Sequence, residues 1–131
     1  MKYLLLLFGD ESSWADMTEE EAGAELAAYE RYGEEATKAG VFVAGEGLQP
    51  TSTATTMRIA GGERILSDGP FAETKEQLGG FYVLDCKDLD DALAWAERCP
   101  ASGSGSIEIR PVMDYEAVGY GESGDSGDVS R

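Results

Sequence analysis

The chain has 131 residues, enough for one domain with a buried core, and its 26 acidic and 10 basic residues give a formal net charge of −16. A surface this acidic repels phosphate backbones and anionic lipids, so we expect neither direct nucleic-acid binding nor membrane binding. We place the protein in the cytoplasm, because no apolar run reaches the roughly 18 to 20 residues of a membrane helix. Histidine is absent, which removes the commonest acid–base residue and metal ligand.

The first part of the chain predicts a strand followed by a long helix. Residues 3–8 (YLLLLF) form a strand without polar alternation, so we expect both of its faces to be covered. A helix is predicted over residues 18–38, because Thr18 and Glu21 form a capping box and Gly40 suits the C-terminal end. Helical spacing assigns this helix a buried stripe of Ala22, Leu26, Tyr29, Gly33 and Ala36.

The rest of the chain predicts a second strand, a hairpin and a further strand–helix–strand unit. Residues 41–44 form the second strand, and the β-branched run 53–60 turns back into residues 63–66 as a hairpin. The last unit is a strand over 81–86, a helix capped by Asp88, and a strand over 106–113. The residues expected inside this part are Leu89, Ala92, Leu93 and Ala96, with Cys86 and Cys99 as buried reduced thiols.

This order predicts an α+β fold, a ferredoxin-like split βαβ antiparallel sheet with an inserted hairpin. Two helices cover only one face of such a sheet, whereas the strand over residues 3–8 is apolar on both faces. A second copy packed sheet to sheet is the simplest cover, so we expect a homodimer. Tyr3, Trp14 and Tyr82 are expected in the core or interface. Residues 116–131, which are acidic and rich in Gly and Ser, predict a flexible tail.

Several long motifs resemble the DGPF branch of the YCII-related family of small bacterial proteins. They are the opening MKYLLLLFGDESSW, the segment DGPFAETKEQLGGFYVL, the helix end AWAERCP and the closing IEIRPV. The resemblance takes residues 1–115 as one domain and implies a dimeric α+β barrel. It implies either an enzyme with a histidine–aspartate pair in a cleft, or an accessory or regulatory protein that acts through protein contacts, including contacts with an extracytoplasmic-function sigma factor. This chain has the aspartate, Asp68, but no histidine, so a mechanism that needs the pair does not transfer.

The segment around Asp68 is the leading candidate for a site. Asp68-Gly69-Pro70 has the composition of a turn in which the aspartate accepts backbone N–H groups. In the functional interpretation, Asp68 is a base at a small polar cleft, and Lys75 or Arg110 holds the negative charge of a substrate. A third interpretation is that the segment only shapes the dimer, with residues 73–77 as a solvated loop. Whether the protein is an enzyme stays open at this point.

Three further candidates complete the expected site. Arg110 either lines a pocket between subunits or, because Pro111 marks an edge strand, lies in water. Glu46 lies between two glycines, in a strand end or bulge from which it can reach a cleft, and Glu73 is a further expected contact to a small polar or anionic ligand. We expect no metal, because the acidic residues near Asp68 have no ligand spacing, and no cofactor, because residues 45–47 are too short for a phosphate-binding loop.

Overall fold

The computed structural model of the chain describes residues 1–117 and 119. Most of the predicted tail, 118 and 120–131, therefore lies outside the described residues. None of the helices in the described part is long and apolar enough to cross a membrane.

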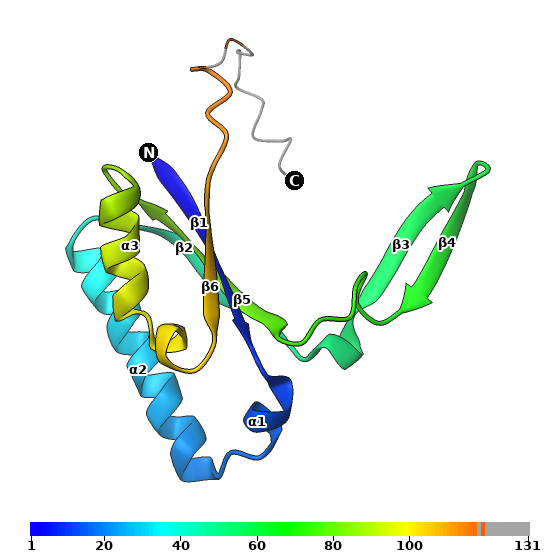
Figure 1. Ribbon diagram of the computed structural model, residues 1–131, viewed down its shortest axis with the longest axis horizontal. Coiled ribbons are helices and arrows are strands. Elements are labelled where there is room, and N and C mark those ends of the chain that lie inside the picture. Colours follow the sequence, from blue (N-terminus) through cyan, green and yellow to red (C-terminus); the bar gives the residue numbers. More distant parts are fainter. Residues whose placement is uncertain (118, 120–131) are drawn as a thin grey trace.

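The described chain is an α+β structure with two antiparallel sheets (Figure 1). The main sheet has the strand order β2-β5-β1-β6, and β3 and β4 form a separate two-stranded sheet, which confirms the predicted antiparallel sheet with an inserted hairpin. The main sheet is open at β2 and β6, so one chain does not form a closed barrel. The elements are β1 (Lys2–Gly9), α1 (Glu11–Ala15), α2 (Glu19–Lys38), β2 (Phe42–Gly47), η1 (Thr51–Thr53), β3 (Thr55–Ala60), β4 (Glu63–Asp68), β5 (Gln77–Asp85), α3 (Leu89–Arg98), η2 (Pro100–Gly103) and β6 (Ser106–Pro111).

Local capping explains where the helices begin. At α2 the Thr18 hydroxyl accepts the N–H of Glu21, and the Glu21 carboxylate accepts the N–H of Thr18, so the predicted capping box is confirmed. Asp88 caps α3 in the predicted way. The short helix α1 was not predicted, although Asp10 caps it through the N–H of Ser12. Hydrogen bonds from Ser12 also lower the pKa of Asp10.

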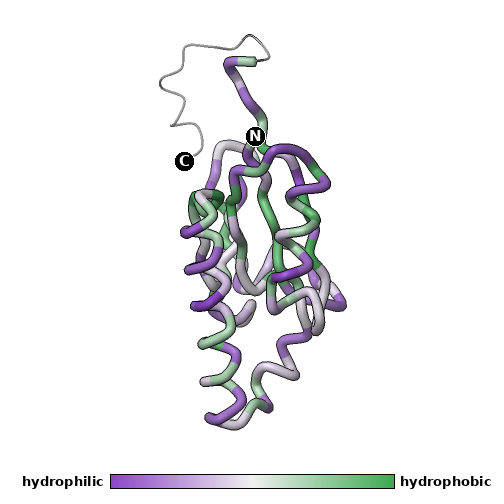
Figure 2. Tube along the Cα trace, turned by 90° about the vertical axis from the view of Figure 1, so that its left-hand side faces the viewer, coloured by the Kyte–Doolittle hydropathy of each residue, from purple (hydrophilic) through white to green (hydrophobic). Residues whose placement is uncertain are grey.

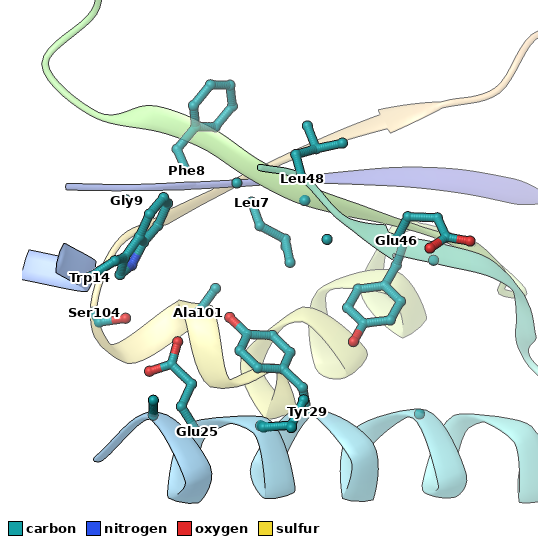
Figure 3. Close-up of a pocket in the computed structure, with 18 of the residues that line it drawn as sticks. Leu7, Phe8, Gly9, Trp14, Glu25, Tyr29, Glu46, Leu48, Ala101 and Ser104 are labelled. Carbon is teal, nitrogen blue, oxygen red and sulfur yellow. The ribbon is translucent and has the colours of Figure 1, made fainter. Parts of the chain in front are cut away.

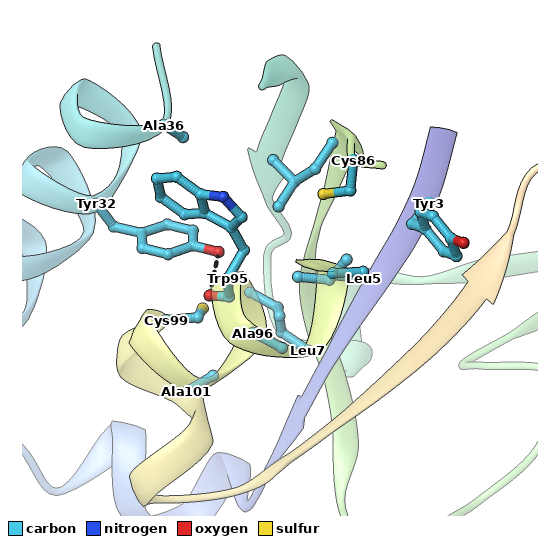
Figure 4. Packing of buried hydrophobic residues seen from close by; sticks show 12 residues of the cluster. Tyr3, Leu5, Leu7, Tyr32, Ala36, Cys86, Trp95, Ala96, Cys99 and Ala101 are labelled. Atoms are coloured by element: carbon cyan, nitrogen blue, oxygen red, sulfur yellow. Dashed lines mark hydrogen bonds between the residues drawn. The ribbon is translucent and has the colours of Figure 1, made fainter. Parts of the chain in front are cut away.

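The core lies between one face of the main sheet and the helices α2 and α3 (Figures 1 and 4). Tyr3, Leu5 and Leu7 of β1 are buried and alternate with half-buried residues. The Tyr32 hydroxyl donates a hydrogen bond of 2.8 Å to the carbonyl of Trp95 inside this core (Figure 4). Hydrophilic residues recur along the helices, while hydrophobic stretches run through the strands (Figure 2). The other buried members are Ala36, Leu84, Cys86, Ala92, Ala96, Cys99 and Ala101.

The two cysteines are confirmed as buried free thiols. Burial raises the pKa of both Cys86 and Cys99, which keeps them protonated and unreactive at neutral pH.

The buried faces of the helices are only partly as predicted. On α2, Ala36 is buried but Ala22 is exposed and Leu26 is 61% exposed. The reason is length, since 20 residues of helix span about 30 Å and the N-terminal half of α2 runs past the packed core (Figure 1). On α3, Ala92 and Ala96 are buried as predicted, but Leu89 and Leu93 are exposed and Trp95 takes the inner position.

The face of the main sheet opposite the helices is also apolar. Leu4 pairs with Val83 and Leu6 pairs with Phe81, so these side chains share a face, and all four are half-buried. We call this surface, with Phe8, the outer face. The prediction that both faces of the first strand are covered is thus met by the helices on one side only, within the described chain.

The hairpin β3–β4 projects away from the rest of the molecule (Figure 1). We call residues 55–68 the arm. Every residue of β4 is exposed, and Met57 on β3 lies opposite Leu66 on β4, where both are also exposed. The arm is therefore a sheet with an apolar pair on its surface that no other described element packs against.

Candidate functional site

A cavity of about 620 Å³ lies between the helix side of the main sheet and the N-terminal half of α2 (Figure 3). The exposed N-terminal part of the α2 stripe, Ala22 and Leu26, forms part of its wall. Its volume falls in the range of about 300 to 1,000 Å³ that small-molecule sites occupy. Aromatic and aliphatic side chains make up most of the wall, namely Leu7, Trp14, Met17, Leu26, Tyr29, Phe42 and Tyr82.

Two of these rings, those of Trp14 and Tyr82, pack directly against glycines. A Cβ added to Gly79 would lie 2.5 Å from the indole of Trp14, and one added to Gly9 would lie 2.8 Å from it. A Cβ on Gly45 would lie 2.5 Å from the ring of Tyr82. Real Cβ atoms do not approach ring carbons this closely, so a larger residue at any of these positions displaces a ring of the cavity wall.

The double glycine is part of β5, not a bend before it as the predicted strand limits imply. Leu7 pairs with Gly80 and Phe8 pairs with Leu78, which leaves Gly79 as an extra residue in a β-bulge. Gly45 and Gly47 likewise lie inside β2, where the register shifts between Phe42 and Ala44. Residues 45–47 are therefore the end of a strand, as one of the two interpretations predicted, and the bulge lies earlier in β2.

Hydrogen bonds hold α1, and with it Trp14, at one end of the cavity (Figure 3). The N–H of Glu11 donates to the side-chain oxygen of Gln77 on β5 at 2.9 Å. The Glu11 carboxylate accepts the N–H of Thr51 at 2.7 Å and the hydroxyl of Thr51 at 2.8 Å. Because Glu11 joins three separate segments, it fixes the position of the short helix that carries the indole.

Polar groups face this cavity without partners in the described chain. In Figure 3 the Glu25 carboxylate and the Tyr29 hydroxyl point into the cavity from α2. Neither makes a hydrogen bond or ion pair with another described residue, and the same holds for the Tyr82 hydroxyl. Burial raises the pKa of Tyr82 to about 12 and also raises that of Tyr29. Both hydroxyls are therefore neutral near pH 7 and are available as hydrogen-bond donors.

Comparison with known proteins places the chain in a family. Residues 1–116 match the family model of the YCII-related domain. The chain belongs to the YCII-related family. An uncharacterized protein of Rhizobium meliloti (strain 1021) is 42% identical over 121 residues, which cover 88% of this chain and 95% of the relative. The family resemblance of the sequence motifs is thereby confirmed.

Among the predicted site residues of this YCII-related chain, Glu46 is the one that lines the cavity. Glu46 pairs with Phe81, whereas its neighbour Gly45 pairs with Tyr82. Neighbouring residues of a strand point to opposite faces, so the Glu46 side chain belongs to the outer face and meets the cavity at its rim. Its carboxylate does not share the interior with Glu25.

Asp68 lies elsewhere, at the end of β4 in the arm. It pairs with Thr55, is exposed, and its carboxylate accepts no hydrogen bond from a described residue. The turn itself is held by Gly69, which has φ of +101° and whose N–H donates to the carbonyl of Ala54 at 2.8 Å. The glycine part of the turn prediction is confirmed, but the carboxylate is not used by the turn.

The structure does not bring the predicted cations to Asp68. Glu73 and Lys75 lie exposed in the loop between β4 and β5. Arg110 lies on β6, an edge strand of the other sheet, and its Nε is 3.4 Å from a carboxylate oxygen of Glu108. Arg110 is 67% exposed, so in one chain the interpretation of an edge strand in water holds. The ligand and catalytic roles given to these residues stay predictions.

No group of three acidic or thiol side chains in the described residues is placed to hold a metal ion. The residues with the best cavity positions, Trp14, Glu25 and Tyr29, were not predicted as ligand contacts. Their local patterns are those of a short capped helix and an amphipathic helix, which look the same whether the apolar stripe meets a core or a cavity.

Proposed function

We propose that this YCII-related protein binds a small organic molecule in the cavity between the main sheet and α2. The observation that carries the proposal is a space of about 620 Å³ with aromatic walls and polar groups that have no partner in the described chain. A ligand there gains apolar contact with Trp14 and Tyr82 and hydrogen bonds from the tyrosine hydroxyls. If a reaction follows binding, Glu25 is the carboxylate placed to move a proton.

The pair Gly45→Ala and Gly23→Ala tests this site. The first change displaces the Tyr82 ring of the cavity wall, whereas Gly23 is exposed on α2 outside the cavity lining, and a Cβ there meets no atom within 4 Å. We expect fragments from a small-molecule library to shift the amide NMR signals of residues 45 and 79 in the wild type and in Gly23→Ala, but not in Gly45→Ala. Shifts that map to the arm, or binding that survives Gly45→Ala, would contradict the proposed site.

We also propose that two copies pack through their outer faces. The five apolar side chains of this face lie on the two central strands, and no described helix packs on them. Sheet-to-sheet packing removes such a face from water, at a gain of about 25 cal/mol for each Å² of apolar surface. The exposed apolar residues of the arm give the second copy a further surface to contact.

Light scattering after size-exclusion chromatography tests the dimer. We expect a mass of twice the 14.0 kDa of one chain for the wild type and a single-chain mass for Leu6→Glu, which places a charge in the outer face. Leu93→Glu is the matched control, because Leu93 is 43% exposed on α3 and lies outside the outer face. A folded wild-type monomer at high concentration would refute the dimer.

A role of Asp68 as a base depends on that second copy. In one chain its carboxylate is exposed and outside the cavity lining, so a partner has to supply the walls of any cleft around it. Replacing Asp68 by Asn tests this role directly. Unchanged ligand affinity and activity in a dimeric Asp68→Asn protein would remove Asp68 from the site and leave the cavity as the functional centre.

A further inference from the structure

The charged residues of the described cavity lining are all acidic. The described lining includes Glu25, whose carboxylate points into the cavity, and Glu46, whose side chain belongs to the outer face, and it includes neither lysine nor arginine. Glu25 is half-buried and has no ion-pair partner among the described residues. A ligand that fills the cavity removes water from this carboxylate, and the loss of hydration is compensated only if the ligand itself supplies a positive or strongly donating group.

The aromatic walls also favour a ligand with a positive charge. Trp14 closes one end of the cavity, Tyr29 rises from α2, and Tyr82 and Phe42 stand edge to face with ring centres 6.3 Å apart. Ring faces carry negative electrostatic potential and attract ammonium groups, and tryptophan is the best of them. An anionic ligand would meet like charge from Glu25 and the negative faces of the rings at the same time.

We infer that the cavity selects an amine that is positively charged at neutral pH and carries an apolar or aromatic body, with its ammonium group beside Glu25. This inference rests on the proposed function and names its ligand class. It also reverses the sequence-based expectation of an anionic ligand held by Lys75 or Arg110, because neither of those residues lines the cavity. The net charge of −16 assists by concentrating cations near the surface.

Three probes of nearly the same shape but different charge test the inference. Phenethylamine is a cation at neutral pH, phenethyl alcohol is neutral and phenylacetate is an anion. Each is titrated into the full chain at physiological salt, and the amide NMR signals of Gly45 and Gly79 and the indole signal of Trp14 give the affinities. The indole signal is assigned from its loss in Trp14→Phe, since Trp95 is the other tryptophan.

We expect the amine to bind about tenfold more tightly than the alcohol, and phenylacetate to bind most weakly. Glu25→Gln should remove most of the preference for the amine while the alcohol binds as before. Glu30→Gln is the control, because it removes one negative charge from the same helix outside the cavity and should keep the preference.

Three results overturn the inference, and they differ in what else they remove. If all three probes bind equally, or if phenylacetate binds best, the ligand class is wrong and the cavity still stands as a binding site. If no probe shifts the cavity signals, the ligand class falls and the proposed function falls with it. A preference for the amine that persists in Glu25→Gln also overturns the inference, because the selectivity then comes from the net charge.

Discussion

The main body and the arm place the apolar residues of their strands in opposite environments. In β1 the odd-numbered residues are buried beneath the helices, and Leu5 has no exposed surface at all. In β4 every residue is exposed, including Leu66 at 55%. Both strands pair in antiparallel ladders, β1 on both of its edges and β4 with β3 alone, and they differ most in how their side chains pack.

The contrast shows that β pairing alone does not bury apolar surface. A two-stranded sheet in water is only marginally stable unless further strands join it or a second layer covers one of its faces. The body has that layer in α2 and α3, whereas the arm has none within the described chain. An exposed apolar hairpin of this kind is typical of surfaces that contact another molecule, which is the role proposed above for the arm.

The largest expected effect contrasts Leu5→Ala with Leu66→Ala. Leu5→Ala opens a cavity in the core and should lower the free energy of unfolding by about 2 to 5 kcal/mol. Leu66→Ala removes an exposed side chain and should change it by less than about 0.5 kcal/mol. Urea unfolding followed by circular dichroism measures both values. A cost for Leu66→Ala close to that of Leu5→Ala would show that the arm is covered in solution, by a second copy.

The next effect concerns close packing on β2, with Gly45→Ala against Gly47→Ala. The added methyl at Gly45 overlaps the Tyr82 ring, so we expect a loss of about 1 to 3 kcal/mol in unfolding free energy. At Gly47 there is open space, and the change should be about 0.5 kcal/mol or less. Equal stabilities would mean that the ring moves aside without cost, and the rigid wall described here would be wrong.

A smaller effect separates two tyrosines of α2. Tyr32→Phe removes the buried hydrogen bond to the Trp95 carbonyl and should cost about 1 kcal/mol of unfolding free energy. Tyr29→Phe removes a hydroxyl that has no hydrogen bond within the described chain, so its cost should be near zero. The denaturation midpoints of the two variants test this difference. If Tyr29→Phe is as destabilising as Tyr32→Phe, its hydroxyl has a partner in solution.

The smallest expected effect is a loss of stability that is absent at neutral pH and appears only in alkaline solution. Burial raises the pKa of Tyr82 to about 12, above its ordinary value of 10.0, and raises those of Tyr29 and Tyr32 as well. The unfolded chain therefore loses these protons first, so stability is complete below pH 10 and declines as the pH rises through 12. In Tyr82→Phe this decline should be shallower. Parallel declines in the two proteins would contradict the assignment to Tyr82.

Much of the fold followed from local patterns in the sequence. The capping box at Thr18 and the cap at Asp88 were readable because their hydrogen bonds join residues three apart. The hairpin was readable from Gly61 and Gly62, both of which adopt positive φ in the turn. The edge position of β6 followed from Pro111, which has no N–H to donate to a further strand.

The site followed from the sequence to a much smaller degree. Leu26 was expected inside because helical spacing identifies an apolar stripe without showing what the stripe faces. Gly79 was expected to let the backbone bend, and it does form a bulge, but its contact with Trp14 joins residues far apart in the chain. Arg110 was paired with Asp68 in the enzyme interpretation, and the two lie on different sheets.

The sequence by itself determined the strands, the helices α2 and α3, their order and the family, because these depend on neighbours along the chain and on long motifs. Only the tertiary structure decided where α2 runs past the sheet and so leaves the cavity open, and where the arm leaves the body. Both features depend on how rigid elements of different length are placed against one another. The placement of α2 follows from the packing of Tyr32, Trp95 and β1, which are distant in sequence and meet only in the fold.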